Sequence, residues 1–202
     1  QYWDLYDNTC GFQKPKTYEE ALETAEALLD DAVSLRLQAD VPVGVFLSGG
    51  IDSSCISKLA YKHNQKLEAY SVGFNEADFD ESYYAHEVAK QIGIKFNHII
   101  CTSDDALKVI DGLQQYYDEP MGDASAIPTS LLCEKAKQHI TVALGGDGGD
   151  EVFFGYPRYL RYAERAWVYR LPMAIRQIMS AGAKVLGKNR LAMSLLPTLF
   201  AL

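Results

Sequence analysis

The chain has 202 residues, of which 48% are hydrophobic and 23% are charged, a composition typical of a globular protein and not of a disordered one. Its net charge of −8 argues against nucleic acid as a partner, because such a surface normally needs a basic patch. No apolar run approaches the ~20 residues that cross a bilayer, so we expect no membrane span.

The start of the chain predicts a helix after an N-terminal segment over residues 1–16. Thr17 and Glu20 have the spacing of a capping box, which satisfies backbone N–H groups at a helix start. The helix should end near Ala39, because Pro42 follows it. Its apolar residues recur at helical spacing and are expected to lie on one face: Ala21, Leu22, Ala25, Leu28, Leu29, Ala32 and Leu35.

Strands and helices then alternate along the chain. Predicted strands cover residues 43–47, 67–74, 96–101 and 141–144, and predicted helices cover residues 53–64, 81–92, 104–117 and 127–139. Asp80 can cap the second of these helices, and Gly93 stops it. The alternation predicts an α/β fold with an open, mostly parallel sheet and helices on both faces, although spacing does not set the strand order. We assign residues 17–157 to this domain and residues 158–202 to its helical continuation, with a helix over 173–186.

The turn after the first strand carries the main functional signal. It has the sequence Ser48-Gly49-Gly50-Ile51-Asp52-Ser53-Ser54. A glycine-rich turn between a strand and a helix exposes backbone N–H groups, and the positive end of the helix dipole adds to the attraction for phosphate oxygens. The turn lacks the Gly-Lys-Ser/Thr ending of a Walker A loop, and it does not match a hydrolase nucleophile elbow.

A second loop of unusual chemistry follows the last predicted strand. It has the sequence Gly145-Gly146-Asp147-Gly148-Gly149-Asp150-Glu151. The glycines allow close approach of the backbone to a ligand, and the three acidic side chains would repel one another unless a cation or a donor lies among them. The spacing is not that of an EF-hand calcium loop. Ligands of parallel sheets bind beyond the carboxyl ends of the strands, which is where both loops begin.

These residues carry a family resemblance. The first loop resembles the PP-loop of ATP pyrophosphatases, and the two loops together resemble the synthetase domain of glutamine-dependent asparagine synthetases. The likeness covers nearly the whole chain, because further motifs follow in the family's order: Tyr2-Trp3-Asp4, Asp40-Val41-Pro42-Val43-Gly44, Ser71-Val72-Gly73-Phe74, Glu119-Pro120 and Ser125-Ala126-Ile127-Pro128-Thr129. β-Lactam synthetase and sugar-modifying amidotransferases share this set.

The resemblance implies an ATP-dependent amide ligase that uses ATP and Mg²⁺. The side-chain carboxylate of aspartate, or another carboxylate acceptor, would attack the α-phosphorus of ATP, and ammonia from a glutaminase domain would then displace AMP. The implied ATP-binding residues are Leu47, Ser48, Gly49, Gly50, Asp52, Ser53, Ser54, Val72, Gly145 and Gly146. Asp52 and Asp150 would hold Mg²⁺, and Asp147 would be the catalytic carboxylate.

Several of these residues also have a plain structural interpretation. Asp52 suits the first turn of a helix, and Val72 suits a core. Asp150 and Glu151 could cap a following helix, and we favour metal binding for the former and a structural role for the latter. The side chains of Asp123, Ser125 and Thr129 either bind the acceptor or cap the predicted helix over residues 127–139.

Departures from the family pattern leave other functions open. The family often has Ser-Gly-Glu where this chain has Gly145-Gly146-Asp147, so an acceptor such as a sugar acid stays open beside aspartate. Another kind of PP-loop ATP pyrophosphatase and a nucleotide-binding module without turnover stay open as well.

The ends of the chain and its cysteines bear on its context. The four cysteines lie 32 to 46 residues apart, which fits neither a zinc site nor a small disulfide framework, so we expect reduced thiols and a cytoplasmic protein. The start at Gln1 and the apolar end over residues 195–202 suggest a truncated piece of a longer enzyme. The sequence does not indicate an oligomeric state, and a homodimer is kept open.

Overall fold

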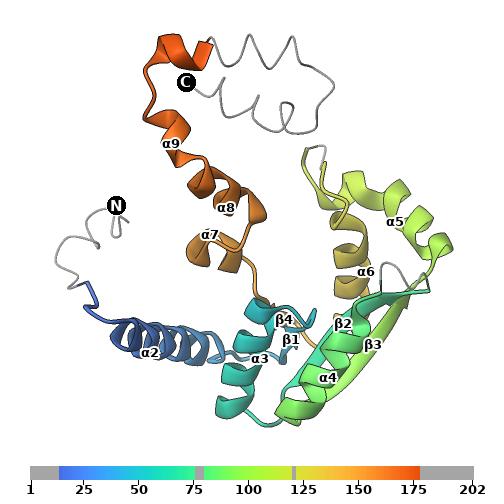
Figure 1. The fold of residues 1–202 in the computed structure, drawn as a ribbon. Coiled ribbons are helices and arrows are strands. Elements are labelled where there is room, and N and C mark those ends of the chain that lie inside the picture. The colour runs from blue at the N-terminus through green and yellow to red at the C-terminus, as the bar shows by residue number, and fades with distance from the viewer. Residues whose placement is uncertain (1–13, 76–79, 120–121, 178–202) are drawn as a thin grey trace. The chain divides into compact units, whose positions relative to one another are not determined.

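The computed structural model describes residues 14–75, 80–119 and 122–177 (Figure 1). The chain divides into two compact units, residues 1–147 and residues 148–202, and each unit is described by itself. The expectations for residues 1–13 and for the apolar end over residues 195–202 lie outside the described residues.

The first unit is built on a four-stranded parallel sheet. Its strands are β1 (Val43–Phe46), β2 (Glu68–Phe74), β3 (Lys95–Cys101) and β4 (Val142–Leu144), in the order β3-β2-β1-β4 (Figure 1). Val45 of β1 is in register with Ala69 on one side and with Leu144 on the other. The chain therefore extends the sheet in one direction from β1 to β3 and then returns to add β4 on the other side of β1. Ligands of open α/β sheets bind at such a reversal.

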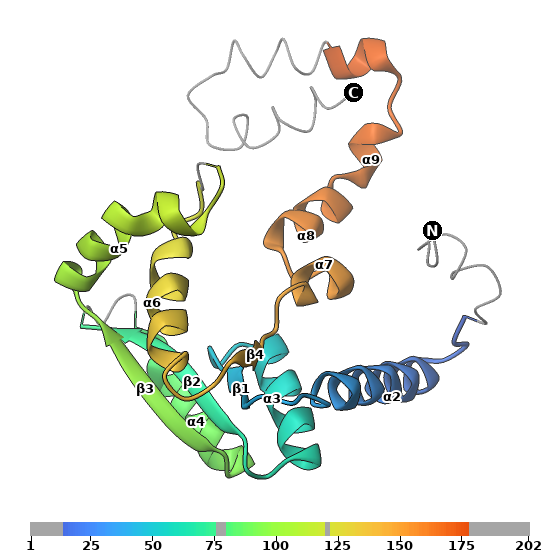
Figure 2. The same ribbon diagram turned by 180° about the vertical axis from the view of Figure 1, so that it is seen from behind.

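Helices cover both faces of this sheet, which confirms the predicted fold class. The helices α3 (Ile51–His63) and α4 (Ser82–Ile92) lie on one face, and α6 (Ala126–Ala136) lies on the other (Figures 1 and 2). Because side chains alternate along a strand, β2 contributes to two cores. Ala69 packs with Val45, Leu47, Ala60 and Ala85, whereas Tyr70 packs with residues of α6 such as Leu132 and Ala136.

The first helix, α2 (Tyr18–Arg36), corrects one prediction. Thr17 caps it as expected, with its Oγ1 accepting from the Glu20 N–H at 3.1 Å, but the Glu20 carboxylate accepts from the Lys16 N–H instead of closing the box on Thr17. The apolar face expected from the sequence is largely exposed, because three of its leucines are at least half exposed: Leu22, Leu28 and Leu35. The side of the helix that packs against the core formed with β1 and α3 is the one that carries Val33 and, at its end, Leu37.

The ends of the other helices follow local rules. Gly93 ends α4 with a φ of +86°, as predicted, and the Asp80 carboxylate accepts from the Ser82 N–H at its start. The helix α5 (Ser103–Tyr116) begins with a capping box that the sequence analysis did not identify, in which Thr102 and Asp105 satisfy each other's backbone N–H groups.

The second unit is helical where the structure describes it. It contains α7 (Gly149–Phe153), α8 (Pro157–Glu164) and α9 (Ala166–Tyr169). The short helix α7 was not predicted. Of the helix predicted over residues 173–186, residues 173–177 are helical and the rest lies outside the described residues. In the part of the chain that the structure describes, no helix has the length and apolarity to cross a membrane.

Candidate nucleotide site

The two glycine loops leave the carboxyl ends of neighbouring strands. The first loop continues β1, and the N–H of Leu47 still donates to the carbonyl of Tyr70 at 2.9 Å before the turn begins. The second loop continues β4, which pairs with β1 in parallel. Both loops therefore begin at the same edge of the sheet, at the reversal of strand order, although they are far apart in sequence.

Serine hydroxyls hold the first loop in shape. Ser53 Oγ donates to the Gly50 carbonyl at 3.2 Å and accepts from the Ser48 N–H at 3.2 Å. Ser48 Oγ lies 3.0 Å from Ser53 Oγ, and Ser54 Oγ donates to the Gly50 carbonyl at 2.6 Å. Since the Ser53 hydrogen is used on Gly50, Ser48 is the donor between the two serines. Ser53 thus shapes the turn, and the residue is buried, with 7% of its surface exposed.

The helix that follows offers unpaired donors. The first hydrogen bond of α3 runs from the Ser54 N–H to the Gly50 carbonyl at 3.0 Å, so the N–H groups of Ile51, Asp52 and Ser53 precede the intrahelical ladder. The N-cap is Gly50, which has no side chain to satisfy them. Together with the positive end of the helix dipole these N–H groups can bind an anion, and α3, with 13 residues, is long enough to have such a dipole.

The second loop lies directly against this helix start. A Cβ added to Gly146 would lie 2.6 Å from the backbone nitrogen of Ser53 and 2.9 Å from the Cβ of Asp52. Only glycine fits at that separation. The structure therefore brings together three of the predicted residues, Asp52, Ser53 and Gly146, from two loops.

Two candidate carboxylates lie on these loops. The carboxylate of Asp147 folds back over its own loop, because a Cβ on Gly145 would lie 3.0 Å from Asp147 Oδ2. Within the described residues of the first unit, no hydrogen bond or ion pair engages the carboxylate of Asp52 or of Asp147. No group of three metal-binding side chains is present among the residues that the structure describes. A single carboxylate suits Mg²⁺, which is usually held by one or two carboxylates together with substrate phosphates.

Asp150 and Glu151 belong to the second unit, in the first turn of α7. Gly155 leaves room for the Asp150 side chain, since a Cβ there would collide with its carboxylate. The hydroxyl of Tyr156 donates to Glu151 Oε1 at 2.5 Å, and this hydrogen bond holds the pKa of Glu151 below its usual range. These contacts agree with a structural role for Glu151.

The remaining candidates lie in the core or just before a helix. Leu47 is buried on the face of α3 and α4, whereas Val72 packs under α6 on the opposite face, so only their backbones lie at a common edge. Asp123 Oδ1 accepts from the Ser125 N–H at 2.9 Å, just before the first residue of α6. The hydrogen bonds from Ser125 hold the pKa of Asp123 below its usual range.

Sequence reasoning missed the neighbours of Gly49. This residue has a φ of +82°, and a Cβ on it would lie 2.6 Å from the Ala85 nitrogen and 2.7 Å from the Tyr84 Cβ. The first turn of α4 therefore contacts the first loop. No sequence signal identifies such a contact, because it joins backbone to backbone.

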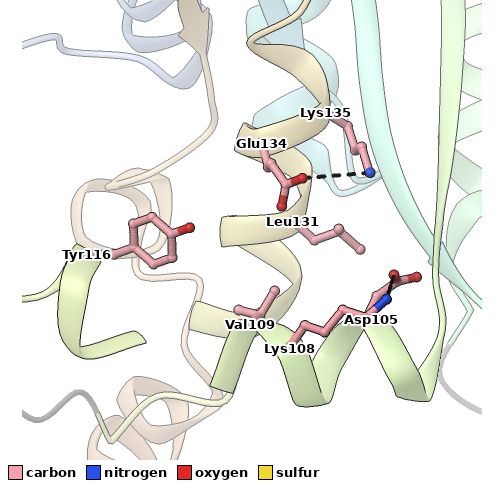
Figure 3. Close-up of a pocket in the computed structure, with 7 residues that line it drawn as sticks. All are labelled: Asp105, Lys108, Val109, Tyr116, Leu131, Glu134 and Lys135. Carbon is pink, nitrogen blue, oxygen red and sulfur yellow. Dashed lines mark ion pairs between the residues drawn. The ribbon is translucent and has the colours of Figure 1, made fainter. Parts of the chain in front are cut away.

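A hollow of about 180 Å³ lies elsewhere, between α5 and α6 (Figure 3). Its charged side chains are paired with near neighbours, Lys108 with Asp105 at 3.9 Å and Lys135 with Glu134 at 3.7 Å. None of its lining residues comes from the two glycine loops. It is not part of the candidate site.

A comparison with protein families agrees with the two-loop arrangement. The model of the family described as asparagine synthase matches residues 24–199, which include both loops and every strand. The chain belongs to the asparagine synthase family.

Relatives in this family are identical to the chain at somewhat more than a third of the aligned positions. It is 39% identical over 181 residues to a protein of Methanocaldococcus jannaschii named "Putative asparagine synthetase (glutamine-hydrolyzing) 2", covering 89% of this chain and 34% of that protein. It is 34% identical over 187 residues to asparagine synthetase (glutamine-hydrolyzing) 1 of Bacillus subtilis, covering 92% of this chain and 29% of that protein. The chain thus spans about a third of the length of these curated relatives.

Among solved structures, the chain is similar to an NH3-dependent NAD synthetase from Campylobacter jejuni, with a TM-score of 0.46 and 16% identity. The match covers 66% of this chain and 60% of that one.

Proposed function

We propose that this chain is the nucleotide-binding part of an ATP-dependent amide ligase that converts aspartate into asparagine. The observation that carries the proposal is the contact of Gly146 with the first turn of α3, which brings two glycine loops and a set of unpaired N–H groups to one edge of the sheet. Family membership supports the choice of reaction.

The reaction has two steps. A side-chain carboxylate oxygen of aspartate attacks the α-phosphorus of ATP, the bond to the bridging oxygen breaks, and pyrophosphate leaves with the electron pair. The nitrogen of ammonia then attacks the acyl carbon, AMP leaves, and the nitrogen loses a proton to give the amide. Such reactions depend mainly on positioning and on stabilising charge in the transition state.

The residues of the first loop suit the binding of the departing pyrophosphate. In this proposal the N–H groups of Ile51, Asp52 and Ser53 bind phosphate oxygens. The hydroxyls of Ser48 and Ser54 hold the loop in the conformation that exposes these N–H groups. A protein with a net charge of −8 needs such neutral donors, since its side chains do not supply an excess of positive charge.

Asp52 and Asp150 are the proposed ligands for Mg²⁺, which when bound would neutralise phosphate charge. The unpaired Asp52 carboxylate supports its part, and the position of Asp150 in the family motif supports the other. Asp147 is proposed to orient the acceptor or the incoming ammonia, because its carboxylate has no partner within the described part of the first unit.

The test measures AMP and pyrophosphate released from Mg²⁺·ATP by the full natural protein with ammonia. We expect aspartate to trigger equal amounts of AMP and asparagine. Asp52→Asn should lower the rate about a hundredfold, whereas Asp104→Asn, on the exposed start of α5, should not change it. AMP release with another carboxylate but not with aspartate would refute the choice of acceptor, and ATP binding without AMP release would refute the ligase.

A further inference from the structure

We propose that Asp80 is a positioning residue for the nucleotide loop: it joins the end of β2 to the start of α4 and so holds α4 against Gly49. The inference rests on the proposed function, because it assigns the first loop to ATP. It also gives a role to Gly73 and Phe74 of the Ser71-Val72-Gly73-Phe74 motif, to which the proposed reaction assigns none.

The Asp80 carboxylate bonds to both elements. Oδ1 accepts from the N–H of Phe74, the last residue of β2, at 3.4 Å, and from the N–H of Ser82, the first residue of α4, at 3.1 Å. Oδ2 accepts from the Ser82 hydroxyl at 2.9 Å. One side chain therefore fixes where α4 begins relative to the sheet.

Gly73 leaves the space that this carboxylate occupies. A Cβ on Gly73 would lie 2.7 Å from Asp80 Oδ1 and would also collide with the imidazole of His98. Position 73 is therefore a glycine because the Asp80 carboxylate occupies the space that a side chain would need. A larger residue at this position would displace the carboxylate from Phe74 and from Ser82.

The start of α4 transmits this position to the nucleotide loop. Ser82 and Ala85 are buried, at 9% and 0% exposure, and the Ala85 nitrogen would lie 2.6 Å from a Cβ on Gly49. The contact is between backbones, so no flexible side chain can absorb a shift of the helix. The second loop also contacts the start of α3, because Gly146 lies against the backbone of Ser53.

The chemistry of Asp80 suits a fixed connection. The hydrogen bonds from the Ser82 hydroxyl and N–H hold the pKa of this carboxyl below its usual range, against the opposing effect of desolvation. Hydrogen bonds to an ionised carboxylate are stronger than those between neutral groups. The connection is therefore fully formed at neutral pH.

Three variants of the full natural protein test the inference. Asp80→Ala removes all three hydrogen bonds, whereas Asp80→Asn keeps an oxygen that can accept from both N–H groups. Asp105→Ala is the matched control, because Asp105 accepts from the N–H and hydroxyl of Thr102 at the start of α5. Among the described residues, neither Thr102 nor Asp105 is hydrogen-bonded to the first loop. Each variant is titrated with Mg²⁺·ATP, and its unfolding in urea is followed.

We expect Asp80→Ala to weaken ATP binding about tenfold, with a matching rise in the KM for ATP at an unchanged kcat. Asp80→Asn should stay within about threefold of the wild type, and Asp105→Ala should lose stability in urea without losing ATP affinity. Equal loss of ATP affinity in Asp80→Ala and Asp105→Ala, or none in Asp80→Ala, would overturn the inference. If the wild type binds ATP but releases no AMP, the proposed function fails, and the affinity ratios still decide the role of Asp80.

Discussion

Replacing Gly146 by alanine tests the contact between the two loops. The added Cβ would lie 2.6 Å from the Ser53 nitrogen, and ordinary van der Waals contact begins at 3.4 Å, so the second loop and the start of α3 must separate by about 0.8 Å. The neighbouring atoms belong to backbone and cannot rotate away. Overpacking of this kind costs about 1–3 kcal/mol of stability. A misplacement of nearly 1 Å at a site of phosphate transfer can cost about a hundredfold in rate.

For Gly146→Ala, urea unfolding measures the loss of stability, and AMP release from Mg²⁺·ATP with aspartate and ammonia measures the loss of rate. Gly145→Ala is the matched control for the unfolding measurement alone, because its Cβ would meet only the end of the flexible Asp147 side chain, at 3.0 Å. We expect the control to change the free energy of unfolding by less than about 0.5 kcal/mol. If the two variants lose the same stability, the reasoning from loop contact is refuted.

Four further substitutions test other parts of the chain. Gly49 and Gly148 both have a positive φ, but only Gly49 also lies against backbone atoms. In urea unfolding, Gly148→Ala should cost about 1–2 kcal/mol, and Gly49→Ala should cost more. Equal costs would contradict a tight contact at Gly49. Thr102→Ala should cost about 1 kcal/mol at neutral pH. Because hydrogen bonds from Thr102 hold the pKa of Asp105 below its ordinary value of 3.8, this carboxylate stabilises the fold above that value and ceases to do so as the pH falls through its lower folded pKa. The urea stabilities of wild type and Thr102→Ala should therefore approach each other as the pH falls below 3.8 and through that lower folded pKa, and a constant difference would refute the assignment. Burial raises the pKa of Tyr70 to about 12, so an absorbance titration should find one tyrosine fewer ionising near pH 10 in wild type, and Tyr70→Phe should remove only the late step.

The fold could be predicted from the sequence as far as local signals reach. The alternation of elements gave the parallel sheet, and Gly93 marked the end of α4 because its left-handed φ favours glycine. The buried face of α2 could not be predicted, since periodicity shows that an apolar face exists but not which side meets a neighbour. Strand order depends on pairing between distant segments, such as Val45 with Leu144, which leaves no local pattern.

The site shows the same division. The sequence predicts the loops as candidate sites, because the full heptapeptide from Ser48 to Ser54 follows an apolar strand and precedes a helix. It does not show that the Ser53 hydroxyl donates to the Gly50 carbonyl, or that the Asp123 carboxylate accepts from the Ser125 N–H, since both depend on side-chain direction. The predicted roles in catalysis and metal binding stay predictions that the proposed experiments address.

The glycines of the two loops have different reasons to be glycine. A Cβ on Gly49 or Gly146 would collide with backbone of the protein itself, whereas one on Gly50 or Gly145 would meet only side-chain oxygens at 3.3 Å and 3.0 Å. The first pair lets α4 and the second loop approach the start of α3. Packing of that kind does not require glycine at positions 50 and 145, so the glycines there are better explained by a ligand that approaches the backbone. Alanine at position 50 or 145 should therefore have its main effect on ATP affinity, and alanine at position 49 or 146 should reduce stability even without ATP.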